Sequence, residues 1–117
     1  MNFSLIICTY MRDKPLLKLL NSVKQQTVYP NEILIIDGSI NEETRKILEV
    51  NQFTNLKYFK VTDNDRGLTR QRNYGVFRVA DNSEVICFLD DDTILETNYF
   101  EELIRTYTFF PDALGVG

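Results

Sequence analysis

The fold and the chemistry are both indicated by residues 84–92, which read EVICFLDDD. The apolar run 85–89 is typical of a strand that is buried in a sheet. The acids that follow it, Asp90, Asp91 and Asp92, therefore lie where a strand of an α/β sheet ends, and open sheets bind ligands at that edge. Adjacent like charges repel one another unless a cation lies nearby, and Mg²⁺ prefers carboxylates together with substrate phosphates. The triplet thus predicts a metal-bridged phosphate compound as the ligand.

Strand and helix signals alternate along the rest of the chain. The expected strands are residues 3–8, 32–36, 56–62 and 85–89. The expected helices are residues 15–26, 40–50 and 69–79, and a last one from Thr97 or Asn98 to a stop before Pro111. Strands joined by helices are nearly always parallel, so the expected product is a Rossmann-like three-layer α/β/α sandwich with a mainly parallel sheet.

One domain accounts for the whole chain, residues 1–117. The ending, residues 113–117, reads ALGVG and looks like the start of a further strand. We therefore expect the chain to be the N-terminal portion of a larger fold, truncated at its C-terminal end.

Composition excludes several classes of function. The net charge is −4, from 13 basic and 17 acidic residues, and no basic run indicates nucleic acid as a partner. No apolar run approaches the ~20 residues of a membrane span. Histidine is absent, which removes Ser–His and Cys–His catalysis from this segment. Cys8 and Cys87 lie in strand candidates without CxxC spacing, so we expect buried, reduced thiols in a cytoplasmic protein. If their strands are neighbours, the two thiols should lie close together.

The first loop, residues 8–15, contains no glycine. Dinucleotide-binding and P-loop ATP sites need glycines at this point, so both are disfavoured. Arg12 in this loop is either a cation beside the ligand or a solvated charge.

Two further segments follow strand ends. Gly38 supplies a turn, and Ser39 with Glu42 matches a capping box for the next helix. Neither explains Asp37, a carboxylate at the end of a buried strand, which could accept a hydrogen bond from a base or a ribose. The segment 66–75 places arginines at the start of a helix, where they oppose the helix dipole. It is either a solvated turn or a positive rim beside an anionic nucleotide.

These motifs together resemble the nucleotide-binding half of a family 2 glycosyltransferase with the GT-A fold. The resemblance rests on four ordered segments and covers essentially the whole chain: SLIICTY (4–10), IDGS (36–39), Gly67 with Arg72, Asn73 and Gly75, and FLDDD (88–92).

The resemblance implies a role for each of these segments. It implies that the donor is a nucleotide-diphospho-sugar, most often a UDP-sugar, with Thr9, Tyr10 and Arg12 bordering the nucleotide. Asp37 would contact the base, and Arg66 and Arg72 would lie beside the pocket. Asp90 would lie near the ribose or donor sugar and the metal, with Asp91 between. Asp92 would bind the Mn²⁺ or Mg²⁺ that stabilises the leaving diphosphate.

The chain also departs from the family pattern. Ile36 stands where members often have a first acid, and Gln71 stands where a small residue is common. The general base and the acceptor site belong to the second half of the family's catalytic domain, so the catalytic residue is unknown here. Inverting transfer, in the cytoplasm or at the cytoplasmic face of a membrane, is implied for the full-length protein.

Other functions stay open at this point. The chain could be a binding module that holds nucleotide and metal without catalysis. A phosphoacceptor receiver domain has a similar length and alternation, but it needs an acidic pair after the first strand and a late lysine. A nucleotidyltransferase has a related sheet, but it usually carries a glycine-rich basic loop after the first strand.

Overall fold

The computed structural model describes residues 1–109. Strands and helices alternate strictly along the chain, as the sequence predicts. The strands are β1 (Phe3–Thr9), β2 (Glu32–Asp37), β3 (Leu56–Lys60) and β4 (Val85–Asp90). The helices are α1 (Asp13–Lys24), α2 (Glu43–Val50), α3 (Leu68–Val76) and α4 (Tyr99–Phe109). The strand expected at the chain's end, residues 113–117, lies outside the described residues.

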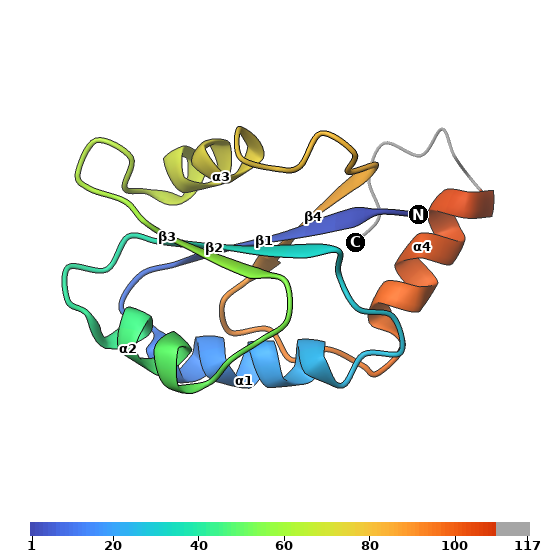
Figure 1. The fold of residues 1–117 in the computed structure, drawn as a ribbon, viewed down its shortest axis with the longest axis horizontal. Helices are drawn as coiled ribbons and strands as arrows, with labels where there is room; N and C mark the ends of the chain where they lie inside the picture. Colours follow the sequence, from blue (N-terminus) through green and yellow to red (C-terminus); the bar gives the residue numbers. More distant parts are fainter. Residues whose placement is uncertain (110–117) are drawn as a thin grey trace.

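The four strands form one parallel sheet in the order β3-β2-β1-β4. β1 lies between β2 and β4, so the ends of these three strands are neighbours (Figure 1). In register, Thr9 is opposite Asp37 on β2, and Cys8 is opposite Asp90 on β4. This arrangement confirms the expected Rossmann-like α/β fold and brings the polar strand ends to one edge of the sheet.

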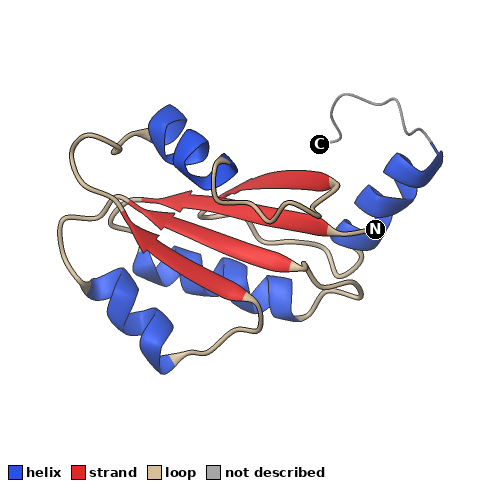
Figure 2. Ribbon diagram, turned by 45° about the horizontal axis from the view of Figure 1, so that its top comes forward, coloured by secondary structure: helices blue, strands red, loops and turns tan. Residues whose placement is uncertain are grey.

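Both faces of the sheet are covered. α1 and α2 lie on one face and α3 on the other, while α4 lies at the end of the molecule near the N-terminus (Figures 1 and 2). Alternate strand residues therefore enter two separate cores. β2 is buried along its whole length, as its aliphatic run predicts for a parallel strand with two covered faces.

Glycine allows α3 to approach the sheet closely. A Cβ built on Gly75 would lie 3.0 Å from Cγ2 of Ile6 and 3.3 Å from Cγ1 of Ile36. Contacts this short are rare for real side chains, so a larger residue would push the helix away from the strands. Gly75 therefore sets the distance between α3 and the sheet.

The predicted capping box is wrong. α2 begins at Glu43 and not next to Ser39, and its N-cap residue, Glu42, makes no capping bond with its side chain. The hydroxyl of Ser39 is buried and instead accepts a hydrogen bond from the backbone N–H of Met11 at 2.8 Å. The hydroxyl that the capping box assigns to the start of α2 is thus used instead in a contact with the first loop. Other bounds differ modestly, since β3 and α3 end earlier than predicted, at Lys60 and Val76.

The two cysteines are free thiols on opposite faces of the sheet. Their strands are neighbours, as expected, but Cys87 belongs to the core beneath α1 and Cys8 to the core beneath α3. The expectation that the thiols lie close together is therefore wrong. Counted along the paired strands, the two cysteines are an odd number of residues apart, and successive residues of a strand point to opposite faces of the sheet. Burial raises the pKa of each thiol to about 11, although Arg72 counteracts part of this effect at Cys8.

Candidate functional site

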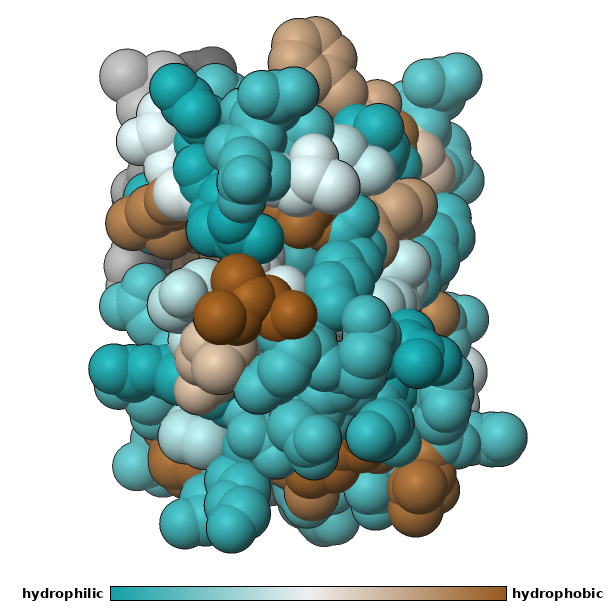
Figure 3. Space-filling model, turned by 90° about the vertical axis from the view of Figure 1, so that its left-hand side faces the viewer, coloured by the Kyte–Doolittle hydropathy of each residue, from teal (hydrophilic) through white to brown (hydrophobic). Residues whose placement is uncertain are grey.

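An open cleft of about 680 Å³ lies at the carboxyl edge of the sheet. Its volume is within the range of small-molecule and cofactor sites. The molecular face at this edge is mainly hydrophilic, with a few hydrophobic side chains (Figure 3). The cleft is lined by eight of the nine residues that the sequence singles out: Thr9, Tyr10, Arg12, Arg66, Arg72, Asp90, Asp91 and Asp92.

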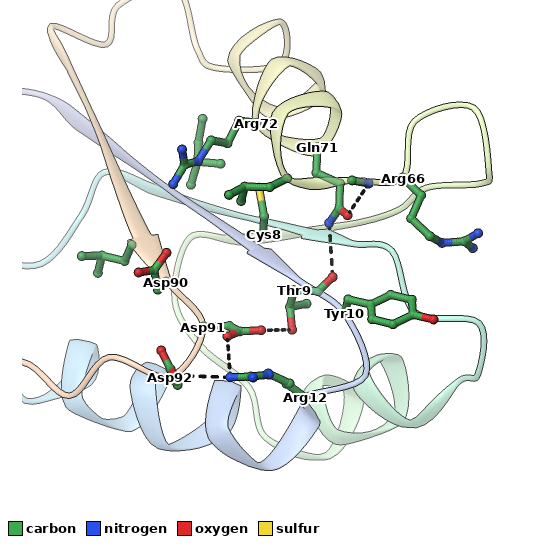
Figure 4. Close-up of a pocket in the computed structure, with 14 residues that line it drawn as sticks. Cys8, Thr9, Tyr10, Arg12, Arg66, Gln71, Arg72, Asp90, Asp91 and Asp92 are labelled. Carbon is green, nitrogen blue, oxygen red and sulfur yellow. Dashed lines mark hydrogen bonds and ion pairs between the residues drawn. The ribbon is translucent and has the colours of Figure 1, made fainter.

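One wall of the cleft carries the acidic triplet. Asp91 is the least exposed of its members, and one of its oxygens accepts a hydrogen bond from the hydroxyl of Thr9 at 3.0 Å. Arg12 from the first loop lies 3.7 Å from Asp91 and 3.2 Å from Asp92 (Figure 4). Asp90, the last residue of β4, and Asp92 are both exposed. The triplet therefore presents two accessible carboxylates, while Asp91 anchors the loop to β1.

The pKa of Asp91 is raised above its ordinary value. Burial of the carboxyl is the main cause, and the charges of Asp92 and Asp90 act in the same direction. The hydroxyl of Thr9 and the guanidinium of Arg12 oppose the shift. Ionised Asp91 is thus less favourable here than in water, and a cation bound nearby would stabilise its charge.

The opposite wall comes from the start of α3. Arg72 lines the cleft and lies over the ring of Phe88, 5.4 Å from its centroid. Arg66 also lines it, donates from Nε to the carbonyl of Gly38 at 2.6 Å, and pairs with Asp63. Arg66 and Arg72 therefore lie across the opening from the acidic triplet. A ligand that carries both a cation and anionic groups would match this distribution of charge.

Two other residues of this helix face elsewhere. Arg70 and Asn73 line a separate shallow depression beside Phe77, on the outer side of α3. Of the arginines at this turn, only Arg66 and Arg72 are therefore part of the cleft. This divides the predicted positive rim into a cleft-facing pair and one surface charge.

Asp37 lies beneath the cleft and does not line it. Its side chain is fully buried. One oxygen accepts the backbone N–H of Ser39 at 2.8 Å, and the other accepts the hydroxyl of Tyr58 at 2.6 Å. Since Ser39 in turn binds the backbone of Met11, the carboxylate organises the turn after β2 and, through it, the first loop.

Gln71 is a cleft residue that the sequence interpretation missed as a site residue. The sequence marks it only as larger than the residue that is common at this position in the family. In the structure it is buried and lines the cleft between the ends of β1 and β2. Its amide contacts the carbonyl of Thr9 at the end of β1 (Figure 4) and that of Ile36 near the end of β2. A polar side chain on the otherwise buried face of a helix is the one sequence signal that could have drawn attention to it.

The acids suit a cation that is held only partly by protein. Within residues 1–109, no group of three or more acidic or cysteine side chains is arranged to hold a metal alone. Mg²⁺ and similar ions commonly use one or two carboxylates and complete their shell with water and substrate phosphates. Asp90 and Asp92 supply oxygen donors of this kind beside an open cleft. The residues present therefore fit a metal that arrives with a phosphate ligand.

Comparison with known proteins identifies the family. The sequence profile described as glycosyl transferase family 2 matches residues 4–116. The chain belongs to this family. Membership decides against the receiver-domain interpretation and confirms the resemblance seen in the four motifs.

Family 2 relatives with assigned activities resemble the chain in sequence. A glucosyl-dolichyl phosphate glucuronosyltransferase of Haloferax volcanii is 28% identical in a match 119 residues long that covers 100% of this chain and 37% of that protein. The O-antigen chain rhamnosyltransferase RfbN of Salmonella typhimurium is 33% identical over 95 residues, 81% of this chain and 29% of that protein. The chain thus spans about a third of the length of these relatives.

A solved structure shows the same fold. TarS of S. aureus, residues 1–349 in complex with UDP-GlcNAc, superposes with a TM-score of 0.78 at 24% identity. The match covers 93% of this chain and 32% of that chain. The GT-A architecture expected from the resemblance is therefore confirmed. None of the helices within residues 1–109 combines the length and apolar character that crossing a membrane requires.

Proposed function

We propose that this chain is the donor-binding portion of a glycosyltransferase that uses a nucleotide-diphospho-sugar. The observation that carries the proposal is the cleft at the carboxyl edge of the sheet, where Asp90 and Asp92 face the opening opposite Arg72. Family membership gives the reaction class, transfer of a sugar from the donor to an acceptor. A UDP-sugar is our preferred donor, supported by the TarS structures with UDP-GlcNAc and UDP.

In this proposal the acid wall holds a divalent cation, Mn²⁺ or Mg²⁺. Asp92 is the principal ligand because it is exposed and lies at the mouth of the cleft. Asp90 contacts the metal or the donor sugar, and Asp91 fixes the loop through Thr9. The metal, when bound, stabilises the charge that develops on the leaving nucleoside diphosphate. Arg12, which pairs with both Asp91 and Asp92, either stays as a second cation or moves aside for the metal.

The remaining parts of the proposal concern the full-length protein. We assign inverting transfer to it, with a general base and an acceptor site supplied by residues outside this chain. We place the reaction in the cytoplasm or at the cytoplasmic face of a membrane, in keeping with two free cysteines.

Calorimetry on the full-length protein tests this function. Binding of UDP, GDP and dTDP is measured with Mn²⁺, with Mg²⁺ and with EDTA. We expect UDP to bind more tightly than GDP or dTDP, and to bind only when metal is present. Asp92→Ala should weaken UDP binding by about tenfold or more. Asp81→Asn, at an exposed aspartate outside the cleft, is the matched control. Equally tight binding in EDTA, or no effect of Asp92→Ala, would refute the metal bridge.

A further inference from the structure

Gln71 joins three backbone segments of the cleft with one side chain. It is 3% exposed. Its Nε2 donates to the carbonyl of Ile36 at 2.8 Å and to that of Thr9 at 3.2 Å. Its Oε1 accepts the backbone N–H of Gly67 at 3.1 Å. The ends of β1 and β2 and the start of α3 are therefore fastened to one another through a single amide.

Gln71 and Gly38 fit each other closely. A Cβ built on Gly38 would lie 2.7 Å from Oε1 of Gln71 and 3.2 Å from Cγ of Arg66. Three hydrogen bonds hold the amide in this place, so it cannot simply rotate away. The glycine after Asp37 therefore leaves room for Gln71, in addition to forming a turn.

The amide of Gln71 offers no free N–H donor to a ligand. Both of its N–H donors are used by strand carbonyls, and its oxygen already accepts one hydrogen bond. An apolar residue in its place would leave the carbonyl of Ile36 buried without this donor. Its effect on a ligand must therefore act through the backbone that it holds, including Thr9 and the neighbouring Arg72.

We propose that Gln71 is a positioning residue for the nucleoside part of the donor, an inference that rests on the proposed function. The acids that suit the metal and diphosphate come from the end of β4 and the loop after it (Figure 4). Gln71 lies instead between the ends of β1 and β2, so it forms the floor of the part of the cleft left for the nucleoside. Its three bonds keep the first loop and Arg72 at the separation that this group requires.

The test compares a nucleotide with its inorganic part. Affinities for UDP and for pyrophosphate, both with Mn²⁺, are measured on the full-length protein and on Gln71→Ala, Gln71→Met and the control Gln52→Ala, which changes an exposed glutamine. We expect both Gln71 variants to weaken UDP about tenfold, with pyrophosphate changed less than about twofold. Gln71→Met retains the volume without the donors, so it separates hydrogen bonding from filling of space.

Three outcomes would overturn the two proposals in distinguishable ways. If the unaltered protein binds no nucleoside diphosphate, the proposed function fails. If it binds UDP and both Gln71 variants bind equally well, only the role of Gln71 fails. Equal weakening of UDP and pyrophosphate also refutes positioning of the nucleoside, because it indicates a general loss of structure.

A double variant supplies an independent check, because it measures stability and does not require the Gln71 variants to bind nucleotide. Gly38→Ala should lower the melting temperature, since its methyl group meets the held amide at 2.7 Å. In a Gln71→Ala background the same change should cost clearly less, because the nearest atom, Oε1 of Gln71, is gone and only the looser contact with Arg66 remains. Equal costs in the two backgrounds would show that the amide is not fixed in place, and the inference would be withdrawn.

Discussion

The hydroxyl of Thr9 donates a hydrogen bond of 3.0 Å to the carboxylate of Asp91, across 82 positions of sequence. Thr9 is the last residue of β1 and Asp91 follows the last residue of β4, so this bond joins two neighbouring strands at their carboxyl ends. It makes the acid wall a continuation of the sheet and not a loose loop.

Replacing Asp91 by asparagine should stabilise the protein at neutral pH. Burial raises the pKa of this carboxyl, so the folded protein holds its proton to higher pH than the unfolded chain does. Protonated Asp91 therefore contributes stability below the ordinary pKa of an aspartate, and this contribution is lost as the pH rises through the pKa of Asp91 in the folded protein. At pH 7 the ionised carboxylate thus lowers the free energy of unfolding. The asparagine side chain would avoid that charge and could still accept the bond from Thr9.

Thermal unfolding from pH 3 to pH 8 measures this effect. The advantage of Asp91→Asn should be greatest at neutral pH and disappear in acid, while Asp81→Asn should track the unaltered protein. A lower melting temperature at pH 7 would mean that the pairing with Arg12 outweighs burial.

Replacing Thr9 by valine should destabilise the fold by about 1–3 kcal/mol, because a mostly buried carboxylate loses a donor. The change should also raise the pKa of Asp91 further, since the hydroxyl lowers it. Urea unfolding and a carbon-13 titration of the carboxyl measure the two effects. Thr62→Val, at an exposed threonine, serves as the control. An unchanged titration would show that the bond is absent in solution.

Cys8 should react slowly with thiol reagents although it borders the cleft. Its pKa of about 11, raised mainly by burial, leaves only about one thiolate in a thousand at pH 8. Peptide mapping after exposure to iodoacetamide distinguishes it from Cys87. Labelling of Cys8 should increase above pH 10 and become slower still in Arg72→Ala, because this arginine lowers the thiol pKa. Rapid labelling at pH 8 would contradict the burial seen here.

Replacing Gly75 by alanine should destabilise the protein despite the better helix propensity of alanine. The methyl group would lie 3.0 Å from Cγ2 and 3.2 Å from Cδ1 of Ile6. Crowding of this kind costs about 1–3 kcal/mol, against a propensity gain of about 1 kcal/mol. Adding Ile6→Val removes one of the crowding atoms and should recover part of the loss in urea unfolding. No recovery would indicate that the cost arises elsewhere.

The sheet could be predicted because its signals are local and strong. The aliphatic run of β2 indicates burial on both faces, and the acids after β4 are visible as a break from apolar to charged residues. Since parallel strands end at the same edge, the meeting of Thr9 with the acid triplet followed from topology. Eight of the nine singled-out residues line one cleft for that reason.

What could not be predicted depends on contacts between distant segments. Ser39 satisfies a local capping motif, but the N–H of Met11 takes its hydroxyl. Asp37 ends its strand like the other acids, yet Tyr58 and Ser39 occupy both of its oxygens below the surface. Gln71 carries no motif at all, because its partners are backbone carbonyls, which every residue possesses.

The strand order has a consequence for the newly made chain. β1 is synthesised first, yet one of its two neighbours is β4, the last of the described strands in the sequence. On a ribosome, β1, β2 and β3 can associate before β4 has been synthesised, while the other edge of β1 is still unpaired. The wall that bears Asp90 and Asp92 arrives only with β4. A nascent chain can therefore acquire most of its core before the acid wall exists. Under the proposed function, a metal-bound donor binds only after β4 is in place.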